Sequence, residues 1–160
     1  EVVPGLSSAV AGPGVAGIPL THRDFASSVS FVTGHEDPTK AESAVDWGAL
    51  AETGGTLVVL MGVGKLPDYV TALRDAGMDA GTPVAMVERA TLPDERVVTG
   101  TIGTIEARAE AAGIEPPAVT IVGDVVDVRE TVAHCLGGSE AVVDAPLAGT
   151  TDGLAEVNRQ

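Results

Sequence analysis

The sequence predicts an α/β domain of three layers, in which a mixed β-sheet lies between helices. Short apolar runs alternate with segments of helical spacing along most of the chain, which is the pattern of sheet strands joined by helices. The length of 160 residues fits one ordinary domain. The chain has only two Phe, one Trp and one Tyr, so its core must be aliphatic, and aliphatic cores suit helices packed on a sheet.

The chain opens with a turn followed by a short helix. Ser7 and Ser8 follow a Pro-Gly turn and precede an Ala-rich stretch that reaches Gly17. Hydroxyl side chains are favoured at helix N-termini, because their oxygen accepts a hydrogen bond from an otherwise unpaired amide of the first turn. We therefore expect a helix that begins at the serines and ends at residues 17–19.

A strand, a helix and a second strand follow. Residues 29–33 are expected to form a short strand, and residues 35–44 an exposed polar loop. Asp46 is expected to cap a helix over residues 47–52. Residues 56–61 form a continuous apolar run, which is typical of a strand buried on both faces.

Another helix and two more strands occupy the middle of the chain. Apolar side chains at helical spacing predict a helix over residues 66–76, and Gly77 is placed to end it. Strands are expected at residues 83–88 and 96–101. The second of these is the more polar, which indicates a position nearer the edge of the sheet.

The last predicted elements complete one domain that spans residues 1–136. Thr104 is expected to cap a helix, residues 118–122 to form a buried strand, and residues 125–136 to form an amphipathic stretch. Residues 137–160 mix Gly, Ala, Thr and acidic side chains without periodicity, so we expect a mobile acidic tail there.

Charge and cysteine content exclude several classes of partner. The formal net charge is −14, whereas proteins that bind nucleic acids or anionic membranes do so through clustered Lys and Arg. No apolar run is long enough to span a bilayer, and the single Cys135 cannot form an internal disulfide. We therefore expect a cytoplasmic protein that binds neither nucleic acid nor membrane, with Cys135 as a small buried side chain outside any site.

Two kinds of site are disfavoured by spacing. A Gly-rich segment follows the apolar run at residues 60–65, but a dinucleotide fingerprint would need Gly at the position of Pro67. A phosphate-binding loop would need Gly at the position of Val59 and a hydroxyl side chain at that of Leu66. The three histidines lie far apart in the sequence without a paired ligand spacing, so no metal is expected.

A donor-rich cluster lies at residues 17–24, which read Gly-Ile-Pro-Leu-Thr-His-Arg-Asp and are expected to form a loop. Loops held by a rigid scaffold often carry function. Arg23 could bind a ligand carboxylate through its planar fork. A surface ion pair between Arg23 and Asp24 is the alternative, and the residues alone favour it.

Four segments together resemble the uroporphyrinogen-III C-methyltransferases of the tetrapyrrole methylase family, and the likeness runs over residues 1–129. The resemblance implies two α/β domains that hold S-adenosyl-L-methionine in the cleft between them, usually in a homodimer. It also implies transfer of two methyl groups to carbons of uroporphyrinogen III, which gives precorrin-2, the precursor of sirohaem and cobalamin. The four segments are residues 2–8 (Val-Val-Pro-Gly-Leu-Ser-Ser), 17–24, 32–35 (Val-Thr-Gly-His) and 83–88 (Pro-Val-Ala-Met-Val-Glu).

The resemblance also implies roles for particular residues. Relatives hold the cofactor through positions that match Ser7, Ser8, Met61 and the backbone of Ala90, a position that is often Gly in the family. Arg23 matches a substrate-facing arginine, and Met61 matches a position close to the transferred methyl group. The resemblance therefore implies that Arg23 and Met61 are the catalytic residues. His22 could contact the substrate as well, or it could hydrogen-bond the backbone to hold its turn.

The sequence is expected to supply only the C-terminal half of such an enzyme. The chain does not begin with Met, and the Gly-Pro-Gly-Asp turn and Gly-Gly-Asp loop of the family's first domain do not occur in it. Three alternatives stay open. They are another precorrin methyltransferase, a non-catalytic binding or dimerisation module, and an α/β ligand-binding regulator.

Overall fold

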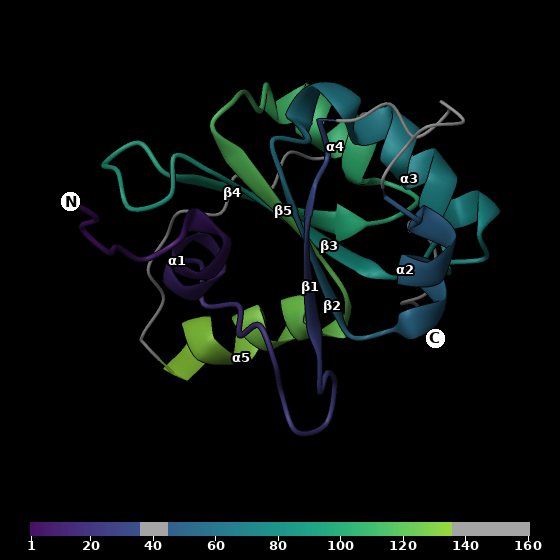
Figure 1. Cartoon of the computed structure of the whole chain (residues 1–160), viewed down its shortest axis with the longest axis horizontal. Coiled ribbons are helices and arrows are strands. Elements are labelled where there is room, and N and C mark those ends of the chain that lie inside the picture. The colour runs from purple at the N-terminus through teal and green to yellow at the C-terminus, as the bar shows by residue number, and fades with distance from the viewer. Residues whose placement is uncertain (36–44, 136–160) are drawn as a thin grey trace, which may run out of the picture.

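The computed structural model describes residues 1–35 and 45–135, which form a five-stranded sheet with helices on both faces (Figure 1). This arrangement confirms the predicted fold class, a mixed sheet in a three-layer α/β domain. The elements in chain order are α1 (Ser8–Val15), β1 (Val29–Thr33), α2 (Trp47–Thr53), β2 (Thr56–Leu60), η1 (Val63–Lys65), α3 (Leu66–Asp75), β3 (Pro83–Glu88), β4 (Arg96–Thr101), α4 (Ile105–Ala112), β5 (Ala118–Val122), η2 (Asp124–Asp127) and α5 (Val128–Cys135).

The sheet has the strand order β1-β2-β5-β3-β4. β1 and β2 are parallel, whereas β5 is antiparallel to both β2 and β3, and β4 is antiparallel to β3. β2 and β3 therefore end, and β5 begins, at one edge of the sheet, which contains Leu60, Glu88 and Ala118 and which we call the carboxyl edge. The relatively polar strand β4 is an outermost strand of the sheet, as its composition predicts.

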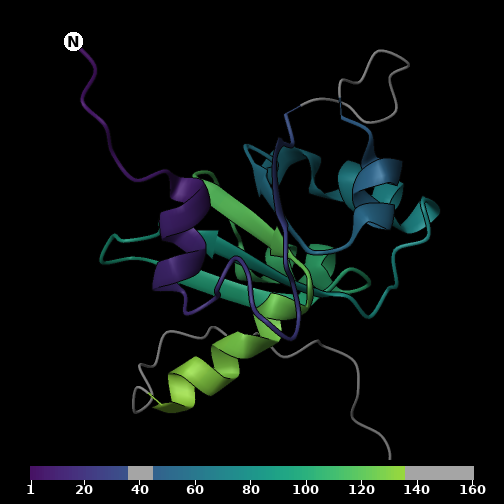
Figure 2. The same ribbon diagram turned by 60° about the horizontal axis from the view of Figure 1, so that its bottom comes forward.

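Two separate cores cover the two faces of the sheet. On one face, alternate residues of the strands, such as Val59 and Met86, pack under α2, α3 and α4. On the other face, their neighbours Val58 and Val87 pack under α1 and η2. Figure 2 shows α1, in purple, and α5, in yellow-green, on the same side of the sheet. Because successive side chains of a strand point to opposite faces, a strand covered on both faces must be apolar on both, which explains the apolar run at residues 57–60.

Helix termini agree with the sequence at two positions and differ at two others. The Ser7 hydroxyl accepts a hydrogen bond from Ala9 N at 3.3 Å, and Asp46 Oδ1 accepts one from Ala49 N at 2.9 Å. Thr104 occupies the N-cap position of α4, but its hydroxyl accepts instead from the amide of Thr101 at 2.9 Å. α1 ends at Val15 rather than at residues 17–19.

The C-terminal part of the domain corrects one expectation. Cys135, the last residue of α5, is exposed rather than buried, because no residue of this helix is buried. The amphipathic stretch divides into η2 and α5. Of the expected loop at residues 35–44, all but His35 lies outside the described residues, as does the expected tail at residues 137–160. Within residues 1–35 and 45–135, no helix has the length and apolar character needed to cross a membrane.

Gly34 allows the end of β1 to approach the turn that follows β2. Its amide donates to Leu60 O at 2.7 Å, and an added Cβ would lie 2.7 Å from both Gly62 Cα and Val59 Cγ1. Because backbone cannot move aside cheaply, we expect Gly34→Ala to lower the free energy of unfolding by about 1–3 kcal/mol. Gly14→Ala is the control, since a Cβ at this helical position meets open space. Urea denaturation measures both variants, and equal midpoints would contradict the expectation.

Candidate functional site

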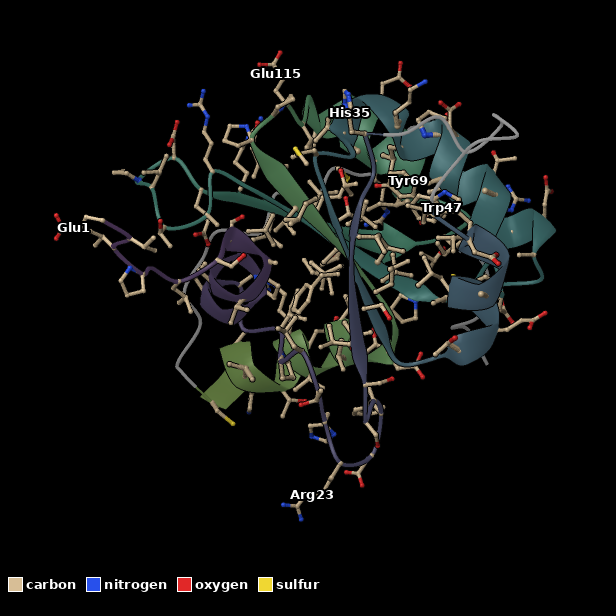
Figure 3. All side chains as sticks on the ribbon, in the orientation of Figure 1. Glu1, Arg23, His35, Trp47, Tyr69 and Glu115 are labelled. Atoms are coloured by element: carbon tan, nitrogen blue, oxygen red, sulfur yellow. The ribbon has the colours of Figure 1, made fainter. Side chains whose placement is uncertain are left out.

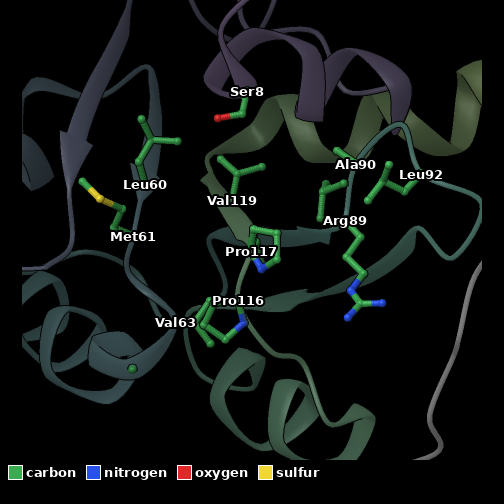
Figure 4. A pocket seen from close by; sticks show the side chains of 13 residues that line it. Ser8, Leu60, Met61, Val63, Arg89, Ala90, Leu92, Pro116, Pro117 and Val119 are labelled. Atoms are coloured by element: carbon green, nitrogen blue, oxygen red, sulfur yellow. The ribbon is translucent and has the colours of Figure 1, made fainter.

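A cavity of about 650 Å³ opens at the carboxyl edge of the sheet. This volume is in the range of small-molecule binding sites. Figure 4 shows side chains from the ends of β2 and β3, the start of β5 and the N-terminus of α1 around it. The lining residues are Ser8, Leu60, Met61, Val63, Gly64, Val87, Arg89, Ala90, Leu92, Pro116, Pro117, Ala118 and Val119.

The cavity wall is mainly apolar, with polar side chains at two places. Ser8 contributes a hydroxyl from the first turn of α1, and Arg89 contributes the one charged side chain among the lining residues. Arg89 forms a hydrogen-bonded ion pair with Asp94, and both side chains are about half exposed. This pair lowers the pKa of Asp94 and raises that of Arg89. Such a wall suits a flat apolar ring with polar substituents near the rim.

Unusual backbone conformations cluster at this cavity. Among the described residues, positive φ angles at non-glycine positions occur at Met61 (54°), Arg89 (49°) and Thr91 (72°). Met61 and Arg89 line the cavity, and Thr91 lies between the lining residues Ala90 and Leu92. Conformations of this kind cost about 1–3 kcal/mol each and concentrate at functional sites. β2 and β3 thus both end in sharp turns that direct their next residues to the cavity.

Gly12 determines how closely α1 approaches the cavity wall. An added Cβ at Gly12 would lie 2.7 Å from Val119 Cγ1 and 3.7 Å from the Cβ of Ala90. The helix therefore packs directly on β5 and beside the residues that follow β3. This close packing places Ser8 at the cavity, because it lies one helical turn before Gly12.

The structure brings together three of the four residues predicted to bind the cofactor. Ser8, Met61 and Ala90 all line the cavity although they come from different parts of the chain. Met61 is 69% exposed although it lines the cavity. Ser7 lies next to Ser8 as the N-cap of α1, outside the lining set. Their contacts with a cofactor stay predictions.

Arg23 and His22 lie elsewhere. Both belong to the loop before β1, and Figure 3 shows Arg23 at the opposite end of the domain from His35, which follows the carboxyl end of β1. Arg23 is exposed, and neither residue lines the cavity. Their substrate contacts therefore stay predictions that this cavity alone does not support.

The turn around His22 has its own stabilising contacts. His22 Nδ1 accepts a hydrogen bond from Asp24 N at 3.2 Å, and the His22 amide donates to Ala26 O at 2.8 Å. The imidazole also lies 4.9 Å from the ring of Phe25 between centroids. The interpretation that His22 holds its turn is confirmed. The Asp24 carboxylate lies 3.8 Å from His22 Nδ1, so Asp24 faces the histidine.

Other lining residues were not predicted from the sequence. Pro116 and Pro117 come from the segment between α4 and β5, and Leu92 comes from the segment between β3 and β4. The Pro-Pro pair directly before a buried strand was a signal that could have indicated a fixed loop. In the described ranges no group of three or more His, Cys, Asp or Glu side chains is placed to hold a metal ion.

Comparisons with known proteins agree with one another. The family model described as Tetrapyrrole (Corrin/Porphyrin) Methylases matches residues 1–106. An S-adenosyl-L-methionine-dependent uroporphyrinogen III methyltransferase of Methanosarcina barkeri is 52% identical over 134 residues, which cover 84% of this chain and 52% of that protein. A uroporphyrinogen-III C-methyltransferase of Synechocystis is 41% identical over 142 residues, covering 86% of this chain and 54% of the relative. This chain therefore spans about half the length of these curated relatives.

Solved structures show the same relationship. A uroporphyrin-III C-methyltransferase from Thermus thermophilus in complex with S-adenosylhomocysteine has a TM-score of 0.64 and 37% identity, covering 80% of this chain and 52% of that one. A cobalt precorrin-4 methyltransferase has a TM-score of 0.71 and 28% identity, covering 79% of this chain and 53% of that one. Together with the sheet order and the cavity at the carboxyl edge, these matches show that the chain belongs to the tetrapyrrole (corrin/porphyrin) methylase family.

Proposed function

We propose that the protein containing this chain transfers methyl groups from S-adenosyl-L-methionine to uroporphyrinogen III and so forms precorrin-2 for sirohaem and cobalamin synthesis. The observation that carries this proposal is the cavity, where Ser8, Met61 and Ala90 meet. The Methanosarcina and Synechocystis relatives, named for this activity, and the Thermus structure with S-adenosylhomocysteine support it.

The residues of the cavity fit an adenosyl group. Val119 and Pro117 offer apolar surface for a purine ring, while the Ser8 hydroxyl can hydrogen-bond its polar atoms. When bound, S-adenosyl-L-methionine supplies an electrophilic methyl group on its sulfonium sulfur. Met61 and the residues after β3 would hold the adenosyl group in one orientation, and this fixed geometry is the main contribution of the chain to the rate.

We further propose that this chain supplies one of two domains. Residues 1–136 would form the C-terminal α/β domain, residues 137–160 an acidic tail, and an N-terminal domain would close the cavity. Exposed apolar side chains support a covering partner, because Met61 and Leu92 lie at the cavity and Leu6 lies just before α1. Contiguous exposed apolar surface usually marks an interface.

The proposal extends to the oligomeric state, the cellular location and the substrate contacts. A homodimer in the cytoplasm is proposed from the family resemblance, and the exposed Phe25 and Phe31 at the β1 side of the sheet support an interface there. Arg23 and His22 are proposed to bind the carboxylates of the substrate. Because Arg23 lies far from the cavity, this role requires that Arg23 bind a substrate that is held in another domain or at another copy of the chain.

Methyl transfer by the full-length protein tests the proposal. With uroporphyrinogen III and S-adenosyl-L-methionine in the absence of oxygen, we expect a product heavier by two CH2 units, because each methyl group gained is accompanied by the loss of one proton from the tetrapyrrole. Arg23→Ala is expected to raise the KM for uroporphyrinogen III more than the KM for S-adenosyl-L-methionine, whereas Arg74→Ala, at another exposed arginine, changes neither. Absence of any methylated product overturns the proposed activity.

Another tetrapyrrole methyltransferase is the second candidate function. The likeness to the cobalt precorrin-4 methyltransferase, whose TM-score exceeds that of the Thermus enzyme, favours it. The same assay separates the two candidates, because this alternative predicts methylation of a precorrin but not of uroporphyrinogen III. A non-catalytic module would methylate neither substrate, whether or not it binds S-adenosylhomocysteine.

A further inference from the structure

Glu88 is a buried carboxylate next to the cavity but outside it. It is the last residue of β3 and is only 2% exposed. Its neighbours Val87 and Arg89 line the cavity, whereas the side chain of Glu88 points to the opposite face of the sheet, where α4 packs. A carboxylate is costly to bury unless it is fully paired. A carboxylate at this position must therefore be held by specific hydrogen-bond donors.

Glu88 pairs with Arg96, which lies directly opposite it on β4. Arg96 Nε donates to Glu88 Oε2, and the amide of Glu115 donates to Glu88 Oε1 at 3.0 Å. Both carboxylate oxygens are thus used. The pKa of Glu88 lies below its ordinary value, and the hydrogen bond from Arg96 is the largest cause of this shift.

The rest of the Arg96 guanidinium binds the end of α4. Nη1 donates to Ala112 O at 2.7 Å, and Nη2 donates to Gly113 O at 2.8 Å. Ala112 is the last residue of α4 and Gly113 is its C-cap, so neither carbonyl has a partner within the helix. The planar arginine fork therefore fixes the strand pair, the helix end and, through Glu88, the amide of Glu115 in one arrangement.

This arrangement leads directly to the cavity wall. Residues 112–115 are held by the Glu88–Arg96 pair, and the next two residues, Pro116 and Pro117, line the cavity. Pro117 O in turn accepts a hydrogen bond from the amide of Arg89 at 2.9 Å. The segment that contains the two prolines is consequently attached to the end of β3 at two points, through the side chain of Glu88 and through the backbone of Arg89.

We propose that Glu88 and Arg96 form a positioning pair that fixes the Pro116–Pro117 wall and thereby determines the affinity of the cavity for S-adenosyl-L-methionine. The proposal rests on the proposed function, because it concerns the same cavity. Neither side chain lines the cavity, so the pair acts through the segment that it holds. An ion pair with a buried carboxylate contributes little net stability compared with apolar side chains, but its directional hydrogen bonds define geometry.

Substitutions at both partners of the pair, made in the full-length protein, test the proposal. Glu88→Gln retains an acceptor for the Glu115 amide but removes the charge that Arg96 binds. Arg96→Lys retains the charge but loses the fork that joins the Ala112 and Gly113 carbonyls. Arg108→Lys is the matched control, since Arg108 Nη1 also donates to a backbone carbonyl, that of Thr99 at 3.1 Å, but on a part of β4 that does not line the cavity.

The readouts are the Kd for S-adenosylhomocysteine by calorimetry, the KM for S-adenosyl-L-methionine, kcat, and the Tm without ligand. We expect Glu88→Gln and Arg96→Lys to raise Kd and KM by about tenfold while kcat falls by less than about threefold. Arg108→Lys is expected to leave Kd within about twofold of the wild type, even if its Tm falls by as much as the Tm of Glu88→Gln or Arg96→Lys.

The outcomes separate the proposal from its alternatives. An unchanged Kd in both Glu88→Gln and Arg96→Lys overturns the positioning role. The role is also overturned if Arg108→Lys raises Kd as much as the two pair variants do when all three have lost the same amount of Tm. If Glu88→Gln does not fold, Arg96→Lys decides by the same criteria. Absence of S-adenosylhomocysteine binding by the wild-type protein contradicts the proposed function itself, whereas binding by the wild type with no effect of the variants contradicts only the positioning pair.

Discussion

Ala90→Trp is expected to weaken S-adenosylhomocysteine binding by at least about 100-fold, because the indole ring would fill the space that an adenosyl group needs. Ala90 lies on the cavity wall, and its Cβ is 3.7 Å from the position of an added Cβ at Gly12. α1 occupies the direction toward Gly12, so a larger side chain that leaves α1 in place lies in the cavity.

Calorimetry on the full-length protein measures this effect. Ala107→Trp is the control, because Ala107 is an exposed residue of α4 and does not line the cavity. We expect the control to bind S-adenosylhomocysteine as the wild type does. Wild-type affinity in Ala90→Trp would show that the ligand does not occupy this cavity, and a matching loss in Ala107→Trp would show that the effect is not local.

Tyr69→Ala is expected to destabilise the domain more than any of the other substitutions. Tyr69 is fully buried in α3, stacks on Trp47 with ring centroids 5.4 Å apart, and donates a hydrogen bond to Thr120 Oγ1 at 3.0 Å. Removing the ring leaves a cavity and an unpaired hydroxyl, so we expect a loss of about 4 kcal/mol. Tyr69→Phe keeps the ring and should lose only about 1 kcal/mol. Urea denaturation measures both, and equal losses would contradict this division.

The same tyrosine predicts a dependence of stability on alkaline pH. Burial raises the pKa of Tyr69 above its ordinary value, with the hydrogen bond to Thr120 opposing this in part. The folded protein therefore keeps the proton at pH values where the unfolded chain releases it. The stabilisation is complete below the ordinary pKa of tyrosine, about 10, and is lost progressively as pH rises above it. Because the chain has one Tyr, Tyr69→Phe should lack this loss, and an identical alkaline decline in both proteins would refute the assignment.

Most of the elements were predictable from local pattern. The strands at residues 29–33, 83–88, 96–101 and 118–122 have the predicted bounds, because each is a short segment rich in Val and other β-forming residues. Their pairing was not predictable, since β5 inserts between β2 and β3 although it follows both in the chain. Such long-range pairing depends on how the two apolar faces are covered rather than on any local signal.

The site was predictable only in part. Ser8, Met61 and Ala90 could be identified because the family resemblance marks the turns that follow Pro-Gly, β2 and β3, and the antiparallel insertion of β5 brings these turns together. Pro116 and Pro117 escaped prediction, because the residues before them are held by side chains distant in the sequence: Arg96 donates to Ala112 O, and Glu88 accepts from the Glu115 amide.

The end of β3 has a consequence for sequence change in this family. Val87 and Arg89 serve the cavity while Glu88, between them, serves the helix layer on the other face. Inserting or deleting one residue in β3 would exchange these two sets, placing the carboxylate in the apolar cavity and removing the anchor of the α4 end. Length variation should therefore be absent from β3, which should change in evolution by substitution alone.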